Sequence, residues 1–147
     1  MKKSERLTPV LKLEEMKEQQ AVKRYADARV QCEQEKQKLQ QLIEYSKEYQ
    51  EMIEEKGRVG IAADRLQSYH RFINKLNQAI TQQQQQLLLV QQEAEQQEQY
   101  WLRQRGATIN MDNLVSRYAR DERLVTDKKE QKEMDEQAQQ MAGLSLF

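Results

Sequence analysis

The chain has 147 residues, of which 37% are hydrophobic and 33% charged, with only four glycines and one proline. This is the length of one domain, but it carries too little apolar sequence for a thick globular core. Twenty-four acidic residues balance twenty-four basic ones, which argues against nucleic acid as the main partner because phosphate binding needs an excess of Lys and Arg on one face. The abundance of Glu, Gln, Lys, Arg, Leu and Ala instead favours long amphipathic helices.

Cys32 is the only cysteine, so no disulfide can form within the chain and a reducing compartment is the simplest interpretation. We interpret it as a small buried residue on the apolar stripe of a helix; a reactive or interchain thiol is the alternative. The most apolar run, Leu87 to Val90, is far shorter than the roughly 20 residues of a membrane span, and the N-terminus lacks the apolar segment of a signal peptide. We therefore expect a soluble, cytoplasmic protein.

The first helix is predicted over residues 9–56. Thr8 is a suitable cap, and Pro9 is favoured at the first helical position because its missing N–H would be unpaired there anyway. Strong helix formers fill the sequence up to Lys56, and Gly57 can take the left-handed conformation that ends a helix. Apolar residues recur in alternating steps of three and four, which indicates a coiled-coil seam. This first seam consists of Leu11, Ala21, Tyr25, Ala28, Cys32, Leu39, Leu42, Tyr49 and Ile53.

The second helix is predicted over residues 64–141, after a turn at about residues 57–63. Asp64 and Gln67 match a capping box at its start. Its seam is the longest periodic stretch of the chain and continues in phase through a run of glutamines. Glycine, asparagine and aspartate residues near 106–112 are candidates for a kink or a short break. This second seam consists of Leu66, Tyr69, Ile73, Leu76, Ile80, Gln83, Leu87, Val90, Ala94, Gln97 and Trp101.

A short connection between two long helices predicts an antiparallel hairpin. The expected fold class is therefore all-α, with a long two-helix antiparallel coiled-coil hairpin forming a single elongated domain over residues 1–147. Pairing the two seams brings Tyr49 to Tyr69 and Glu35 to Gln83. The second of these layers is polar, which costs stability but could pin the register of the helices. A functional role for that layer is the weaker alternative.

No catalytic constellation is apparent in the sequence. An enzyme needs convergent acids, bases or a nucleophile, and this chain offers one histidine, one cysteine and no glycine-rich phosphate loop. His70 lies beside the seam, where a flanking side chain is the simpler interpretation than a ligand or a base, and no second His or Cys could complete a zinc site. We predict that the protein is not an enzyme and uses no cofactor or metal.

Excess apolar surface lies close to the predicted turn, where Ile43, Tyr45, Met52, Phe72 and Ala79 are off the strict seam and, with neighbouring seam residues, form two stripes. The predicted register sets the two stripes side by side. Because a two-stranded hairpin has no second layer to cover both a seam and a flank, some of these side chains must face water or a partner, and aromatic residues suit a binding hot spot. Part of the set is alternatively seam, since Ile43 competes with Leu42 for the inward position. The stripes consist of Leu42, Tyr45 and Tyr49 on the first helix and Phe72, Leu76 and Ala79 on the second.

The sequence resembles the FliJ family, small coiled-coil components of the bacterial flagellar type III export apparatus. The resemblance covers nearly the whole length and is strongest in LQQLIEYSKEYQ, LQSYHRFINKLNQAITQ and EQKEMDEQAQQ and at Trp101. The aromatic spacing, with Tyr45 and Tyr49 in one arm and Tyr69 and Phe72 in the other, is more specific than heptads alone. None of these segments is a catalytic signature.

The resemblance implies a fold similar to the stalk of the rotary ATPase γ subunit. It also implies a noncatalytic role at the cytoplasmic face of the inner membrane, coupling the hexameric flagellar export ATPase to the export gate protein and escorting export chaperones. By the same likeness, the helix ends away from the turn would enter the ATPase ring. At positions where the family can carry a polar or His side chain beside the gate-binding surface, this sequence has Lys38 and Gln83. The gate-binding residues that the resemblance implies are Leu42, Tyr45, Tyr49, Phe72, Leu76 and Ala79.

Two alternatives stay open from the sequence. A structural or self-associating coiled coil would turn Tyr45 and Phe72 toward another copy of the chain, whereas a coupling component is expected to be a monomer when isolated. The equivalent stalk of a virulence-type type III secretion system is the other alternative. Mass in solution would separate the first alternative from the export role.

Overall fold

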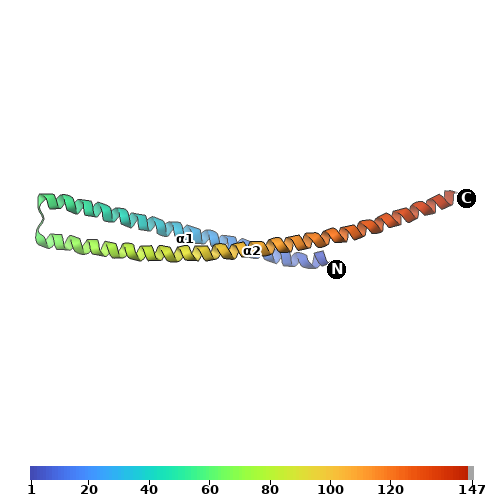
Figure 1. The fold of residues 1–147 in the computed structure, drawn as a ribbon, viewed down its shortest axis with the longest axis horizontal. Coiled ribbons are helices and arrows are strands. Elements are labelled where there is room, and N and C mark those ends of the chain that lie inside the picture. Colours follow the sequence, from blue (N-terminus) through green and yellow to red (C-terminus); the bar gives the residue numbers. More distant parts are fainter. Residues whose placement is uncertain (146–147) are drawn as a thin grey trace. The chain divides into compact units, whose positions relative to one another are not determined.

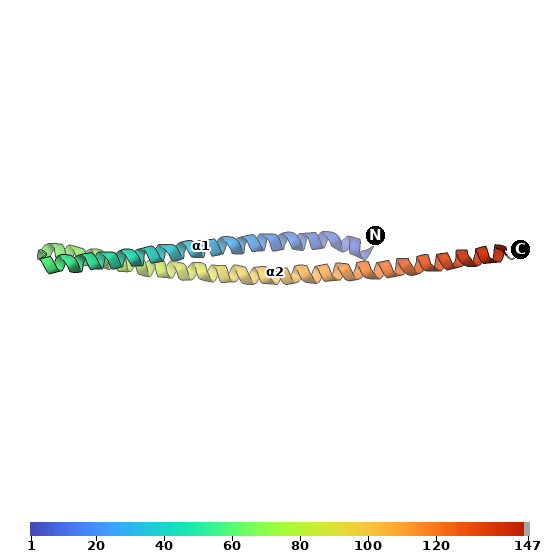
Figure 2. The ribbon, with the colours of Figure 1, turned by 90° about the horizontal axis from the view of Figure 1, so that it is seen from above.

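The computed structural model describes residues 1–145 and contains two helices, α1 (Lys3–Val59) and α2 (Ala63–Ser145), joined by a three-residue loop. The helices run in opposite directions beside each other, as both ribbon views show (Figures 1 and 2). The all-α antiparallel hairpin predicted from the two seams is therefore confirmed. Contacts along the pair group into two compact units, of which one is Ala21–Trp101 and the other joins Met1–Gln20 to the chain from Leu102 onward.

The predicted register of the seams is confirmed in the unit Ala21–Trp101. The rings of Tyr49 and Tyr69 lie 6.0 Å apart between centroids, and the Gln83 side chain donates hydrogen bonds to Glu35. Further from the loop, the thiol of Cys32 donates to the backbone carbonyl of Val90 at 3.1 Å. Cys32 is half-buried against the opposite helix, in agreement with its interpretation as a seam residue.

The core is a narrow strip, because each helix can bury only one stripe against its partner. The buried side chains are mostly small, so that the helices approach closely, and larger residues of the strip stay half-exposed. In the unit Ala21–Trp101, Tyr25 stacks on Trp101 with ring centroids 5.7 Å apart. The buried residues are Ala21, Ser46, Ile53, Leu76, Val90 and Ala94 in this unit and Thr108 in the other.

Helix α1 begins at Lys3, six residues before the predicted start. Thr8 does not cap the helix; its hydroxyl donates to the carbonyl of Ser4 at 2.8 Å, one turn back. Ser4 itself is held by α2, since its hydroxyl donates to Glu122 Oε2 at 2.5 Å and its backbone N–H donates to Oε1 at 3.2 Å. The ammonium group of Lys3 lies 5.4 Å from the centre of the Tyr118 ring. These contacts stabilise a first turn that local sequence signals do not predict.

The carboxylate of Glu122 acts as the cap of α1 in place of Thr8. The hydrogen bond from the Ser4 side chain lowers the pKa of Glu122, helped by the Ser4 backbone N–H and opposed by partial burial. Because the pKa is lowered in the folded state, the contribution of this carboxylate to stability is present above the ordinary glutamate range. It is lost as the pH falls through the lowered pKa.

Ser4→Ala is therefore expected to raise the pKa of Glu122 toward the ordinary value of a glutamate side chain, because the variant lacks the hydroxyl that donates to the ionised form. A carboxyl-carbon NMR titration of Glu122 measures this shift. Ser116→Ala, at an exposed serine of α2, is the control and should leave the titration unchanged. An unchanged Glu122 pKa in the Ser4 variant would show that Glu122 does not cap α1.

The turn lies within the predicted range 57–63, but the left-handed residue that ends α1 is Gly60 and not Gly57 as predicted. Helix α1 continues through Gly57 to Val59, and Gly60 takes the left-handed conformation with φ of 108°. The Gly60 N–H donates to the carbonyl of Lys56 at 3.1 Å, which closes the last turn of α1. The predicted capping box at Asp64 is replaced by a local contact, in which Oδ1 of Asp64 accepts from the Arg65 N–H at 2.9 Å.

Helix α2 runs without interruption through residues 106–112, so the predicted kink or break is wrong. Thr108 is buried here, and its hydroxyl hydrogen-bonds the carbonyls of Glu14 and Gln104. Contact with α1 thus stabilises a stretch of weak intrinsic helix propensity. Beyond Glu122, α2 continues past the start of α1, and its described side chains there are exposed. Within residues 1–145 no helix is long and apolar enough to cross a membrane.

Candidate partner-binding site

Four aromatic side chains near the loop form one cluster, drawn from both helices. Helix α1 contributes Tyr45 and Tyr49, one turn apart, and α2 contributes Tyr69 and Phe72. The Phe72 ring is edge-on to Tyr45 at 6.2 Å between centroids and lies 4.6 Å from Tyr49. Tyr49 also meets Tyr69 edge to face at 72°. We call these four residues the tip cluster; such edge-to-face contacts stabilise aromatic pairs beyond the area that they bury.

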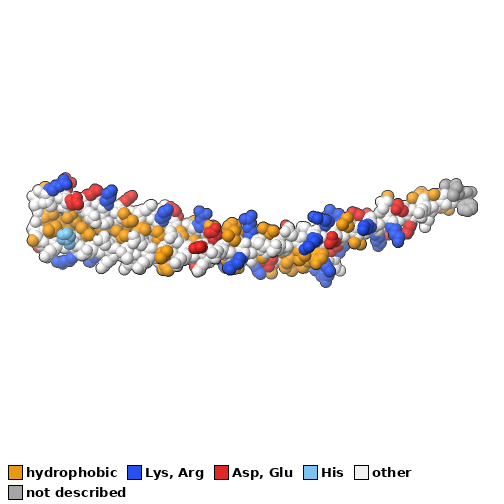
Figure 3. Space-filling model, viewed as in Figure 1, with side chains coloured by type: hydrophobic (Ala, Val, Ile, Leu, Met, Phe, Trp, Pro, Cys, Tyr) orange, Lys and Arg blue, Asp and Glu red, His pale blue; other side chains and the backbone are white. Residues whose placement is uncertain are grey.

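The tip cluster is only partly covered. Tyr45 is 49% exposed, and the other three rings are half-buried. Ile43 and Met52 add exposed apolar surface on α1, the helix that also carries Tyr45. The space-filling view shows hydrophobic side chains gathered at the loop end of the molecule, with the histidine among them (Figure 3). A partly exposed aromatic group on a preformed helical frame suits the docking of a partner protein.

The structure places the six predicted site residues at different depths. Leu76 is only 7% exposed and is a core residue of the helix pair. Leu42, Tyr49, Phe72 and Ala79 are half-buried, so each contributes an edge to the surface rather than a whole side chain. Tyr45 is the most accessible of the six. Leu76 therefore points inward, toward the contact between the two helices.

Two residues of the site were missed by sequence reasoning. Tyr69 was assigned to the seam and to the aromatic spacing but not to the gate-binding set, yet its ring is part of the tip cluster. Lys56 places its ammonium group 5.5 Å from the centre of that ring and 3.3 Å from the Tyr69 hydroxyl. The cation lies over the ring from the other helix, a geometry that favours attraction between the charge and the ring face. Lys56 falls on the grid of the first seam, three residues after Ile53, but a search for apolar residues passes over it because its side chain is charged.

The surroundings of Tyr49 favour the protonated form of its hydroxyl. Partial burial raises the pKa of Tyr49 above its ordinary value of 10.0, and the neighbouring phenols of Tyr69 and Tyr45 raise it further, while Lys56 opposes them. A raised phenol pKa keeps the hydroxyl protonated and able to donate a hydrogen bond. The surface therefore offers a partner aromatic faces together with neutral hydroxyl groups.

Outside the tip cluster, the described chain carries an exposed histidine and a shallow groove. Across residues 1–145, no group of three or more His, Cys, Asp or Glu side chains could hold a metal ion. His70 is exposed on α2, as expected for a flanking residue. A shallow groove of about 820 Å³ beside Cys32 is lined by Tyr25, Arg29, Glu33, Lys36, Gln91 and Glu98, among others. Its lining also includes the apolar residues Ala26, Val30 and Ala94, so the groove mixes charged and apolar side chains.

Fold and site together define a class of protein: a two-helix coiled coil that presents a partly exposed aromatic surface next to its loop. The family model described as Flagellar FliJ protein matches residues 2–145. The Flagellar FliJ protein of Escherichia coli (strain K12) is similar, with 29% identity over 130 residues that cover 88% of this chain and 88% of the relative. No solved structure matches the chain. The chain belongs to the FliJ family, and thereby to the components of the flagellar export apparatus.

Proposed function

We propose that the protein is a noncatalytic coupling component of flagellar export, which links the export ATPase to the export gate and escorts export chaperones. Membership of the FliJ family supports the flagellar role. The observation that carries the coupling role is the tip cluster, a partly exposed aromatic surface built from both helices. A partly exposed aromatic surface on a helical frame supports a role in which the protein acts by binding partners.

The gate is the proposed partner of the surface that contains the tip cluster. Tyr45 would make the largest contact, since half of its side chain is accessible. Tyr49 and Phe72 would add ring edges and fix the Tyr45 ring through their contacts with it. Leu76 would act from beneath, by holding the two helices together. The full proposed gate-binding set is Leu42, Tyr45, Tyr49, Phe72, Leu76 and Ala79.

The purified chain alone is expected to hydrolyse no nucleotide, and to raise the turnover of the hexameric export ATPase when added to it. Phosphate release measured with the chain, the ATPase and both together tests this. A chain heated past its melting temperature is the control for buffer and contaminant effects. Hydrolysis that stays with the chain through a second purification would contradict the noncatalytic role.

Binding of both partners tests the coupling role directly. The chain, immobilised through an N-terminal tag, is expected to retain the cytoplasmic domain of the gate and, separately, the ATPase. Light scattering should give the mass of one chain for the protein alone. A dimer that retains neither partner would instead favour the alternative, a self-associating coiled coil with the aromatic surface turned toward a second copy.

A further inference from the structure

Each unit contains one layer in which a glutamate of α1 meets a glutamine of α2 between the helices. In the unit Ala21–Trp101, Nε2 of Gln83 donates to the Glu35 backbone carbonyl at 3.0 Å and to the Glu35 carboxylate at 2.5 Å. Lys38 lies 3.5 Å from the other carboxylate oxygen. The Glu35 side chain is only 12% exposed, so these hydrogen bonds replace most of its contact with water.

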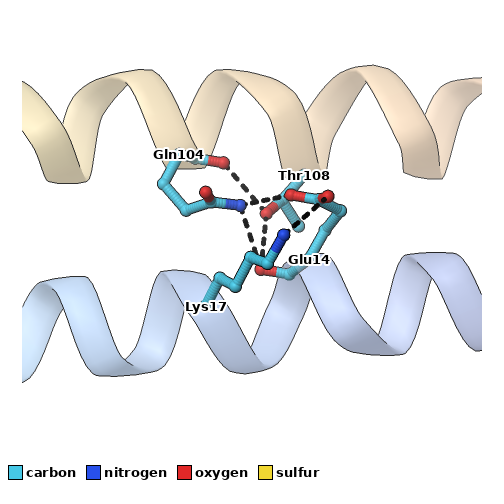
Figure 4. A network of polar contacts seen from close by, with 4 residues as sticks. All are labelled: Glu14, Lys17, Gln104 and Thr108. Carbon is cyan, nitrogen blue, oxygen red and sulfur yellow. Dashed lines mark hydrogen bonds and ion pairs between the residues drawn. The ribbon is translucent and has the colours of Figure 1, made fainter.

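The second layer repeats the first. Nε2 of Gln104 donates to the Glu14 carbonyl at 3.4 Å and also to the Glu14 carboxylate, and Lys17 lies 3.8 Å from the carboxylate. Thr108 adds a third hydrogen bond, to the same carbonyl, at 3.1 Å. Figure 4 shows the four side chains converging between the two helices. The Glu14 side chain is 19% exposed.

The two layers occupy equivalent places in the heptad pattern. Twenty-one residues separate Glu14 from Glu35, and the same number separates Gln83 from Gln104. This interval is three heptads, so both glutamates occupy one seam position of α1 and both glutamines occupy one seam position of α2. Each Glu has a Lys three residues later. We call each combination of Glu, Lys and Gln a clasp.

The apolar seams alone do not select this register. Because they repeat every heptad, sliding one helix past the other by seven residues, about 10 Å, restores apolar contact at many positions. The loop region is compatible with a slide in one direction, namely the slide that moves the turn toward the N-terminus of the chain. A slide by one heptad centres the turn on Gly57 and Arg58 instead of Ile61, and Gly57 costs α1 about 1 kcal/mol in helix propensity relative to Ala.

The clasps oppose this slide. The slide would set Glu35 opposite Leu76 and Gln83 opposite Ala28. The Glu35 carboxylate and the Gln83 amide would then lose the hydrogen bond that joins them. A polar or charged group that loses its partner in a covered position costs at least about 1 kcal/mol, and more when it is charged. The observed register avoids this cost in the unit Ala21–Trp101.

The clasp in the other unit opposes the same slide less completely. Gln104 would face Leu7, whereas Glu14 would face Gln97 and find one new polar partner. A slide in the opposite direction would set Glu14 opposite Met111, without any polar partner. The two clasps together thus distinguish the observed register from its neighbours, although either alone would do so less well.

We propose that the paired clasps are a register lock, and that Gln83 and Gln104 are positioning residues for the tip cluster. The link to the tip is geometric. Tyr45 and Tyr49 meet Phe72 only in the observed register, and a slide of one heptad would carry Phe72 about 10 Å along α1. The lock therefore keeps the aromatic rings of the two helices side by side. This inference does not rest on the identity of any partner.

Engineered cysteine pairs in the full chain test the lock. With Cys32→Ser as background, Ser46→Cys is combined with either Ile73→Cys, which reports the observed register, or Leu66→Cys, which reports the slide. A slide of about 10 Å exceeds the reach of a disulfide, whose Cα atoms lie within about 7 Å. When the clasps are unaltered, oxidation of the cysteine pairs should give the Ser46–Ile73 crosslink and almost none of the Ser46–Leu66 crosslink.

An apolar variant removes both partners of each clasp. Replacing a buried polar pair by apolar side chains is neutral or stabilising, so this variant should be at least as helical and melt no lower. The crosslink that reports the slide should nevertheless rise by about tenfold or more, since one unpaired buried polar group changes a population by about that factor. The variant carries Glu14→Leu, Glu35→Leu, Gln83→Leu and Gln104→Leu.

A matched control places the same four changes on exposed neighbours and should retain the single register. A helical apolar variant that gives only the crosslink of the observed register overturns the lock, and so does equal slippage in the control. If the apolar variant is not helical, a variant with Gln83→Asn and Gln104→Asn decides the question, because the shorter amides cannot reach the glutamates. The lock is overturned if the crosslink that reports the slide does not rise in that variant. The control carries Glu15→Leu, Glu33→Leu, Gln82→Leu and Gln99→Leu.

Discussion

Tyr45→Ala and Phe72→Ala are each expected to weaken binding of the export gate's cytoplasmic domain by about 30-fold, which corresponds to about 2 kcal/mol. Tyr45 presents the most accessible ring of the proposed gate-binding set, and Phe72 holds that ring edge-on at 6.2 Å. Tyr45→Ala removes an aromatic contact with the gate, and Phe72→Ala removes the ring that supports this contact. Isothermal titration calorimetry with the isolated gate domain measures the change in Kd.

Tyr100→Ala is the matched control for these variants. Tyr100 is 41% exposed, close to the value for Tyr45, but it lies on α2 outside the tip cluster. Its removal should leave gate binding unchanged and should alter helix content as little as Tyr45→Ala does. Equal affinity of the Tyr45, Phe72 and Tyr100 variants would show that the tip cluster is not the gate-binding site.

Leu76→Ala is expected to lower the free energy of unfolding by about 2 to 5 kcal/mol, the usual cost of truncating a well-buried leucine. Leu76 is 7% exposed and lies in the contact between the helices, so the variant loses apolar burial and leaves a cavity. Urea unfolding followed by circular dichroism measures the change. Leu89→Ala, at a side chain that is 60% exposed, should cost less than about 0.5 kcal/mol.

Comparing the Tyr45 and Leu76 variants distinguishes a loss of helix packing from a loss of gate binding. Binding must be compared at equal folded fraction, because a destabilised hairpin presents less of its surface. On that basis Tyr45→Ala should bind weakly while melting near the parent, and Leu76→Ala should melt early while its folded fraction binds the gate almost normally. If Tyr45→Ala melts as early as Leu76→Ala, the Tyr45 ring is part of the core and not a contact for the gate.

Much of the candidate site followed from spacing. The two stripes were predicted to lie side by side, and the rings of Tyr45, Tyr49 and Phe72 do meet across the helices. The seam pattern included Leu76, which is core, and left out Tyr45, which is exposed. It did not decide how deeply Leu42 and Tyr49 are buried, and the structure leaves both half-buried. The depth of these side chains depends on how both seams pack together, which spacing along one helix does not describe. Gate binding itself stays a prediction.

The helical hairpin could be predicted from the amino-acid sequence, because a heptad repeat summed over many residues outweighs any local ambiguity. Its register followed from the short connection between the helices together with the pairing of the two seams, and not from the heptad repeat alone. Only the tertiary structure decided where α1 begins, which glycine makes the turn and which polar residues meet. The first turn of α1 depends on Ser4 and Glu122, which are 118 residues apart. Gly60 rather than Gly57 makes the turn, and Glu14 meets Gln104. Such contacts depend on a few atoms brought together by the opposite helix, and no pattern along one helix contains that information.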